Sequence, residues 1–197
     1  MTAPSETAVS PTTLDPDGDL LLTVGALPEF EPQVFKVSAS AMRRASPVWK
    51  AMLFGDWAES KKDDGQEWRA SLPKDDPTAT GHILTIVHLH FHRVPKDLPI
   101  PDLFSIVVVA DKYKMLGCLS PWVDGWVKGS LATGCTRSPV CTVQIAWQLG
   151  HEPLFLASVR QLCLEAEETG RGLGCKEGGL CVVFEHLTFA PEDLSGK

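Results

Sequence analysis

The spacing of hydrophobic residues changes from strand-like to helix-like along the front of the chain. A short apolar run from Asp19 to Val24 follows the turn residues 16–18, and its length and flanks predict a buried strand. Residues 34–38 alternate between apolar and polar, which predicts a second strand that forms a hairpin with the first. A short helix is expected over residues 39–45, and residues 66–72 are again strand-like.

Four dipeptides place a capping side chain directly before a proline: Ser46-Pro47, Asp76-Pro77, Ser120-Pro121 and Ser138-Pro139. Serine or aspartate accepts hydrogen bonds from the first amides of a helix, and proline loses nothing at the first helical position. Apolar residues at helical spacing follow each dipeptide, and they form one apolar face on each predicted helix. Phe91 and Trp147 are assigned to two of these faces and are expected to lie in the core. We therefore predict helices over residues 47–54, 77–91, 121–132 and 139–149. Apolar spacing alone predicts two more, over residues 102–115 and 153–168.

Strands gather at the front of the chain and helices at the back, which predicts an α+β fold rather than an alternating α/β fold. Residues 1–16 are rich in Ser, Thr, Pro and Ala, and we expect a disordered tail there. The main domain is expected over residues 17–133, and a C-terminal helical extension over residues 134–168. Residues 169–197 are interpreted as a Gly-rich linker and short tail, in which residues 180–184 predict a last strand.

Composition and charge narrow the classes of function. The 197 residues are 44% hydrophobic and 22% charged, as in an ordinary folded protein. A net charge of −7, with no Lys/Arg run longer than two residues, argues against a nucleic-acid partner. The sequence contains no stretch of 18 apolar residues, so we predict no membrane-spanning helix. The N-terminus resembles neither a signal peptide nor a transit peptide, so we expect an intracellular protein, in the cytoplasm or nucleus, with reduced cysteines.

Three groups of residues partly resemble metal-binding or phosphate-binding motifs, but the spacing or the residue types of each group fit the motif poorly. His88 and His92 would lie one turn apart on a helix, a spacing that chelates zinc, but no Glu follows His88 and no third ligand is assignable. The pairs Cys135/Cys141 and Cys175/Cys181 are spaced more widely than zinc ligands usually are. The glycines of residues 170–174 match no phosphate-binding loop. We expect no catalytic residue, no cofactor, no metal and no small-molecule substrate, with a His-based metal-dependent enzyme as a remote alternative.

Several short blocks resemble, in the same order, the sequence of a BTB/POZ domain. They are Asp17–Leu22, Phe35–Ser38, Met42–Trp49, Met52–Phe54, Trp57–Ser60, Leu72–Pro77 and Ala110–Tyr113. The residues of these blocks that match the family pattern, and that are expected to be mainly structural, are Asp19, Phe35, Val37, Ser46, Pro47, Trp49, Met52, Asp111, Lys112 and Tyr113. The blocks cover residues 17–133, and the chain is most similar in style to the stand-alone fungal BTB proteins. It departs from the animal members at Leu89–Pro95, where those place a strand.

The resemblance implies a BTB/POZ-like fold, with a small front β-sheet packed on a cluster of helices and extra helices at the C-terminus. It also implies a non-enzymatic module for protein–protein interaction. Members commonly self-associate, so a second copy of this chain is one expected partner, through apolar surface on the first helices and first strand. Many members recruit a cullin scaffold, so a substrate adapter of a cullin-type ubiquitin ligase is the alternative function.

Three residues are candidates for protein contact. Cullin-binding members often carry a hydrophobic-x-Glu tripeptide, and the nearest equivalent here is Ile100-Pro101-Asp102. The Asp102 carboxylate would accept the same amide hydrogen bonds, or would simply cap the helix, which is the interpretation we favour. Trp57 lies near a loop, and tryptophan is enriched at interface hot spots, so an exposed anchor is one interpretation of Trp57. A half-buried core position is the interpretation we favour.

Overall fold

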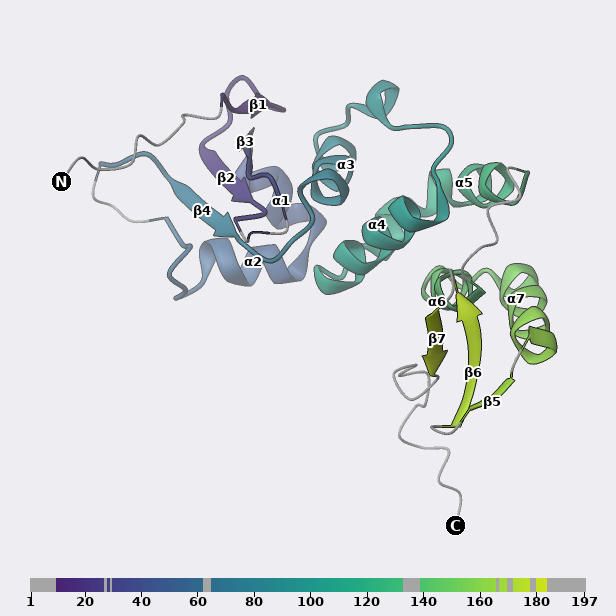
Figure 1. Ribbon diagram of the computed structural model, residues 1–197. Helices are drawn as coiled ribbons and strands as arrows, with labels where there is room; N and C mark the ends of the chain where they lie inside the picture. The colour runs from purple at the N-terminus through teal and green to yellow at the C-terminus, as the bar shows by residue number, and fades with distance from the viewer. Residues whose placement is uncertain are drawn as a thin grey trace, which may run out of the picture.

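The computed structural model describes residues 10–26, 28, 30–61, 65–132, 139–165, 167–169, 172–177 and 180–183. Figure 1 shows the strands of the first sheet at one end of the molecule and the last helices at the other. The elements in chain order are β1 (Thr12–Thr13), β2 (Leu20–Val24), β3 (Gln33–Val37), α1 (Ala39–Ala45), α2 (Pro47–Phe54), β4 (Arg69–Leu72), α3 (Pro77–Val87), the 3-10 turn η1 (Phe91–Arg93), α4 (Ile100–Lys112), the 3-10 turn η2 (Leu116–Leu119), α5 (Ser120–Ala132), α6 (Pro139–Gln148), α7 (Glu152–Glu165), β5 (Glu167–Thr169), β6 (Gly172–Glu177) and β7 (Leu180–Val183).

The first sheet has the strand order β1-β3-β2-β4. β2 and β3 form the predicted antiparallel hairpin, while β2 runs parallel to β4 and β1 runs parallel to β3. Leu22 lies opposite Phe35 on one side and Ala70 on the other, and all three are buried. Within the described residues this four-stranded sheet is joined to seven α-helices, an arrangement compatible with the predicted α+β class.

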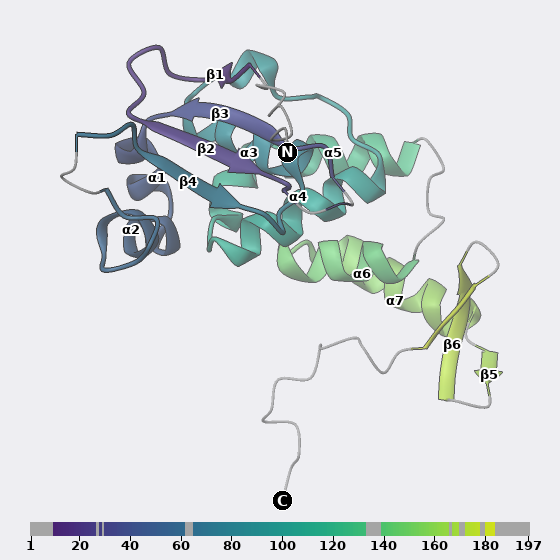
Figure 2. The same ribbon diagram turned by 60° about the vertical axis from the view of Figure 1, so that its left-hand side comes forward.

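One continuous hydrophobic core joins the sheet to the helices. It extends from Leu20 and Val37 in the sheet, through Ile83 of α3 and Ile106 of α4, to Ile145 of α6. Figure 2 shows the strands lying across the helices that cover this face. Because α6 packs on α4, the extension after residue 138 shares the core of the domain.

Two of the predicted Ser/Asp-Pro helix starts are confirmed in detail. The Ser46 Oγ atom accepts a hydrogen bond from the Trp49 amide at 3.0 Å, and Pro47 takes the first helical position of α2. The Asp76 Oδ1 atom accepts from two amides at the start of α3, at 2.8 and 3.0 Å. These caps work because a short side-chain oxygen reaches amides that have no partner within the helix. α6 begins at Pro139 as predicted, and its expected cap Ser138 lies outside the described residues.

Three predicted helices extend past the true C-terminal ends of α3, α4 and α7. α3 ends at Val87 rather than at residue 91, and the next residues form a turn and η1. α7 ends at Glu165, and residues 167–169 form β5 instead of continuing the helix. α4 differs at both ends, because it runs from Ile100 to Lys112 rather than over residues 102–115. Periodicity alone locates the middle of a helix better than its ends, which depend on capping contacts.

Two segments expected to lack regular structure contain strands. Residues 12–13 form β1 on the edge of the first sheet and Leu14 is buried, so the predicted tail is wrong there. Residues 172–177, expected to be a flexible linker, form β6, which pairs with β5 and with the predicted last strand, β7. Backbone pairing with neighbouring strands stabilises both segments, and composition does not report it. The predictions for residues 1–9, Cys135 and residues 184–197 lie outside the described residues.

A buried carboxylate joins the end of α4 to the start of α3. Asp75 is buried and accepts hydrogen bonds from the Tyr113 hydroxyl and the Lys112 ammonium group. The Ser46 hydroxyl donates to the backbone oxygen of Tyr113 at 2.6 Å, and the Trp49 ring packs on the Tyr113 ring with centroids 4.9 Å apart. Burial, together with the adjacent Asp75 carboxylate, raises the pKa of Tyr113 far above its usual value, so the hydroxyl stays protonated and donates.

We expect Asp75→Ala to lower the free energy of unfolding by about 1–3 kcal/mol, because it leaves the buried Tyr113 hydroxyl without an acceptor. Urea unfolding followed by circular dichroism measures this loss. Glu67→Ala is the matched control, since it removes an acidic partner from the exposed ion pair with Arg69 and should change stability by less than about 0.5 kcal/mol. Equal losses in the two variants would contradict the role assigned to Asp75.

Candidate protein-binding surface

The segment between α3 and α4 displays two large apolar side chains to solvent. Leu89 is 72% exposed and Phe91 is 52% exposed. Leu89 follows the end of α3, and Phe91 is the first residue of η1. Exposed apolar residues are common singly, but a neighbouring pair beside a groove is a feature of interaction surfaces.

The end of α3 explains why Leu89 is exposed. The His90 amide donates to the Thr85 oxygen and the Leu89 amide donates to the Ile86 oxygen, each at 3.0 Å. This pair of bonds is a Schellman cap, in which the residue after the cap adopts a left-handed conformation and is usually glycine. Leu89 adopts it with φ of 62°, at a cost of about 1 kcal/mol or more for a residue with a Cβ atom.

His88 ties the end of α3 to the start of α1. Its Nε2 atom accepts from the Ser38 amide at 3.0 Å, so Nδ1 carries the proton and donates to the Leu84 oxygen at 2.8 Å. Partial burial lowers the pKa of His88, and the helix carbonyl it contacts only partly opposes this effect. His88 is therefore a neutral structural residue that sets the separation of α1 and α3.

Two further hydrogen bonds fix the segment that follows. The His90 Nε2 atom lies 2.7 Å from the Leu14 oxygen, and the Trp126 Nε1 atom donates to the Pro95 oxygen at 2.8 Å. The backbone on both sides of Phe91 is thus attached to the rest of the fold. A surface held in place before binding loses less conformational entropy when a partner arrives.

Leu89 and Phe91 border a groove of about 460 Å³, which we call the α1–α5 groove. Its lining comes from α1, the end of α3, the following turn, η2 and α5, and comprises Ala41, Arg44, Ala45, Ile86, Val87, Leu89, Phe91, Gly117, Cys118, Pro121 and Trp122. The Phe91 and Trp122 ring centroids are 5.4 Å apart, and Trp122 stacks in turn on Trp126 at 6.2 Å. The groove is thus mostly apolar, with an aromatic wall and the Arg44 guanidinium as its charged group among the described lining residues.

The residues predicted for cullin contact lie at the start of α4. Ile100 is 3% exposed and belongs to the core, so its side chain offers no surface. The N-cap of α4 is Pro99, so the favoured interpretation of Asp102 as the helix cap is wrong. Asp102 lies instead in the first turn of α4 and is exposed. Its negative charge there interacts favourably with the positive end of the helix dipole.

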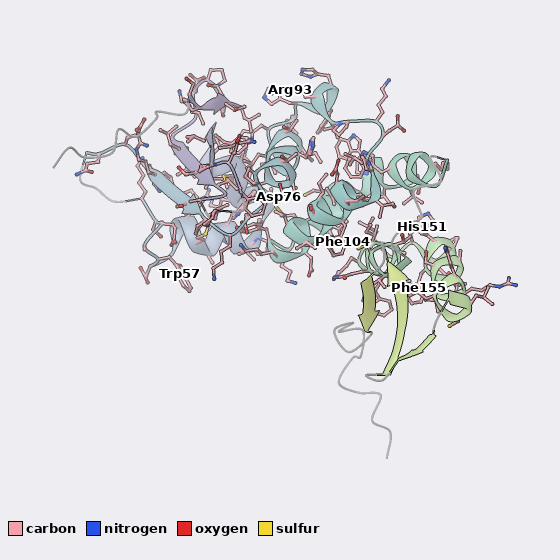
Figure 3. The ribbon with its side chains drawn as sticks, in the orientation of Figure 1. Trp57, Asp76, Arg93, Phe104, His151 and Phe155 are labelled. Atoms are coloured by element: carbon pink, nitrogen blue, oxygen red, sulfur yellow. The ribbon has the colours of Figure 1, made fainter. Side chains whose placement is uncertain are left out.

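Trp57 is exposed, so the favoured interpretation of this residue as half-buried core is wrong. It is 65% exposed in the turn after α2, where its amide donates to the Ser60 hydroxyl oxygen at 3.3 Å. Figure 3 shows Trp57 at the α2 end of the molecule, far from the α6–α7 end. None of the described contacts joins Trp57 to Ile100 or Asp102, so the three predicted residues do not form one site.

Most residues of the family-like blocks have structural contacts. The Asp19 carboxylate accepts from the Ala39 amide at 2.9 Å and so supports the start of α1. Asp111 pairs with Lys114 at 3.1 Å on the surface, and the Met52 oxygen accepts from the Ser60 hydroxyl. The side chains that lie in the core are Phe35, Val37, Trp49 and Tyr113.

The metal-site alternative loses the geometry on which it depended. α3 ends before His88, so His88 and His92 do not lie one helical turn apart, and both ring nitrogens of His88 bind backbone groups. Among the described residues, no group of three or more His, Cys, Asp or Glu side chains is placed to hold a metal ion.

Sequence reasoning missed Leu89 and misplaced Phe91 and Trp147. Phe91 was expected on the core stripe of a longer helix, and Trp147, now 51% exposed, on the core stripe of α6. A leucine in a position that normally selects glycine has no sequence signature.

Comparison with known proteins identifies no relative. No protein-family model matches the chain, and no curated protein matches it. A search of the described residues finds no helix with the length and apolar character needed to cross a membrane.

Stability should fall as the pH is lowered from about 7.5 to about 5.5, because burial lowers the pKa of His88 and of His82 in the folded state. The unfolded chain then binds more protons than the folded chain as pH falls through the unfolded value of about 6.5. Urea midpoints across this range measure the effect. His88→Gln should reduce the change in urea midpoint between pH 7.5 and pH 5.5. The difference between this variant and wild type at pH 7.5 measures the part of the effect that does not depend on pH. An unchanged slope in this variant would contradict a neutral His88.

Proposed function

We propose that the chain is a BTB/POZ-like, non-enzymatic interaction module that binds a protein through the α1–α5 groove. The fold part of this proposal is supported by the way the family-like blocks meet. Ser46 and Trp49 of one block, Asp75 of a second and Tyr113 of a third contact each other through hydrogen bonds and ring packing. Blocks that are distant in sequence thus form one structural unit, as expected for a domain that carries them together.

The observation that carries the function is the strained, exposed position of Leu89. A glycine would satisfy the same cap without the left-handed strain, and a polar residue would avoid exposing an apolar side chain. Lys114 adopts the same conformation after α4, so strain alone does not mark a site; at Leu89 it coincides with an exposed apolar side chain that lines a groove. The side chain is therefore best explained by a contact it makes with a partner.

The groove gives that contact a place to form. Leu89 and Phe91 stand at its edge, and the aromatic wall of Trp122 continues it. Apolar and aromatic side chains on a rigid backbone are the anchors that contribute most to protein interfaces. A second copy of this chain is the first partner to test, because α1 lines the groove and the family resemblance implies pairing through the first helices.

Leu89→Gly should abolish or strongly weaken self-association while leaving the fold as stable as before, or more stable by up to about 1 kcal/mol. Lys114→Gly is a matched control, because Lys114 occupies the same cap position after α4, with φ of 56°, away from the groove lining. Light scattering over a concentration series measures the mass, and urea unfolding measures stability.

A dimer that forms equally well in wild type, Leu89→Gly and Lys114→Gly would contradict binding through this groove. A wild-type monomer at every concentration would exclude a second copy as the partner. Immobilised wild type and Lys114→Gly should then retain the same protein from a cell extract, and Leu89→Gly should fail to retain it.

The adapter of a cullin-type ubiquitin ligase is the second candidate function. One observation favours it: Asp102 does not cap α4, so its exposed carboxylate is available to a partner. The neighbouring Ile100 contributes from within the core by fixing the start of the helix.

Asp102→Lys should abolish binding of a purified cullin scaffold if the chain is such an adapter, because it reverses the charge at the proposed contact. Asp56→Lys makes the same change at an exposed position after α2 and should leave binding intact. Surface plasmon resonance with the two variants and wild type measures the affinity. Equal binding by all three chains would exclude this docking site.

A further inference from the structure

A second apolar hollow lies at the junction of α6 and α7. It has a volume of about 270 Å³ and is lined by Ala146, Trp147, Gly150, Glu152 and Phe155. Figure 3 labels Phe155 and His151 at this junction, away from Trp57. None of its lining residues belongs to the α1–α5 groove.

The turn between the helices holds the two aromatic residues on either side of the hollow. Gly150 adopts φ of 65°, and its amide donates to the Trp147 oxygen at 3.1 Å. The His151 amide donates to the Ala146 oxygen at 2.9 Å, which completes a Schellman cap on α6. The His151 Nδ1 atom then accepts from the Leu154 amide at 3.2 Å and starts α7. Trp147 and Phe155 thus come from the ends of two helices joined by a well-ordered turn.

Among the described residues, two aromatic side chains and one acidic side chain line the hollow. The ring centroids of Trp147 and Phe155 are 5.6 Å apart, with their planes tilted by 46°. Trp147 is half exposed although its place in the helical pattern predicts a core residue. Glu152 is exposed in the first turn of α7 and is the acidic residue among the described residues that line the hollow. Among the described residues, no lysine or arginine lines the hollow.

We infer that this hollow binds one arginine side chain of a partner protein. Aromatic faces attract a cation, and the Trp face does so most strongly. The Glu152 carboxylate would pair with the guanidinium group through charge-assisted hydrogen bonds. The net charge of −7 on the chain favours the approach of a basic segment.

Size and hydration favour arginine over other occupants. A volume of 270 Å³ is below the range of about 300–1,000 Å³ usual for sites that take a whole small molecule, and it suits one side chain. A guanidinium is planar, stacks on aromatic rings and is more weakly hydrated than the ammonium of lysine. An apolar side chain would gain from the two rings but would gain nothing from the negative charge of Glu152.

This site is independent of the α1–α5 groove, so the two are tested separately. The probes are two blocked pentapeptides, Gly-Gly-Arg-Gly-Gly and the same sequence with citrulline, which is uncharged and nearly the same shape as arginine. The readout is the NMR signal of the Trp147 indole N–H, which is one of six tryptophan signals and is assigned by its loss in Trp147→Phe.

The arginine peptide should shift the Trp147 signal at millimolar concentration, and the citrulline peptide should shift it several-fold less. Glu152→Gln keeps the shape of the acidic side chain and should weaken binding about two- to fivefold. Trp147→Ala should abolish the response, read from the neighbouring backbone amides. Trp57→Ala removes an exposed tryptophan elsewhere and should leave binding unchanged.

Three results would overturn the inference. Equal shifts with the arginine and citrulline peptides would show that the hollow does not select charge. An unchanged affinity in Glu152→Gln, in a chain whose circular dichroism matches wild type, would exclude the carboxylate contact. No shift of the Trp147 signal up to about 20 mM peptide would exclude an arginine site at this place.

Discussion

The buried carboxylate of Asp75 holds together the part of the molecule on which the other features depend. It lies just before α3, and it accepts hydrogen bonds from the Tyr113 hydroxyl and the Lys112 ammonium group at the end of α4. A carboxylate without partners in this position would be strongly unfavourable, so the loop and the two helices are coupled. Tyr113 extends the coupling to α2 through the Ser46 hydroxyl and the Trp49 ring. This one cluster thus links α2, the residue before the cap of α3, and the end of α4.

The position of α3 determines what the surface displays. With α3 held in place, its last turn is fastened to α1 by His88, and the backbone then enters the left-handed conformation at Leu89. Helix ends elsewhere in the chain use the same cap, with Gly150 after α6 and Lys114 after α4. Among the described residues, Leu89 is the only one of these three cap residues with a large apolar side chain that is exposed and lines a groove. The buried Asp75 cluster and the exposed Leu89 side chain are thus connected through α3 and the hydrogen bond of His88 to the start of α1.

The α6–α7 hollow adds a surface of a different chemical character. The α1–α5 groove is broad and apolar with a basic residue in its lining, whereas the hollow is small, aromatic and acidic. Surfaces that differ in size and charge select different partners. Because α6 shares the core with α4, both surfaces belong to one folded unit.

The local chemistry of the sequence determined where most elements lie. Ser46-Pro47 and Asp76-Pro77 start helices because the Ser46 and Asp76 side chains cap free amides within three residues. The alternation of apolar and polar residues over 34–38 is likewise a local pattern, and it indicated a strand. Tertiary structure decided the rest. β1 exists because the distant strand β3 pairs with it, β6 pairs with β5 and β7 on either side of it in the chain, and α3 ends where its last turn meets α1. Trp147 is half exposed and packs against Phe155 of α7 instead of lying in the core. The pairing of β1 and the end of α3 depend on contacts between residues far apart in the chain, which the spacing of residues in one segment does not encode.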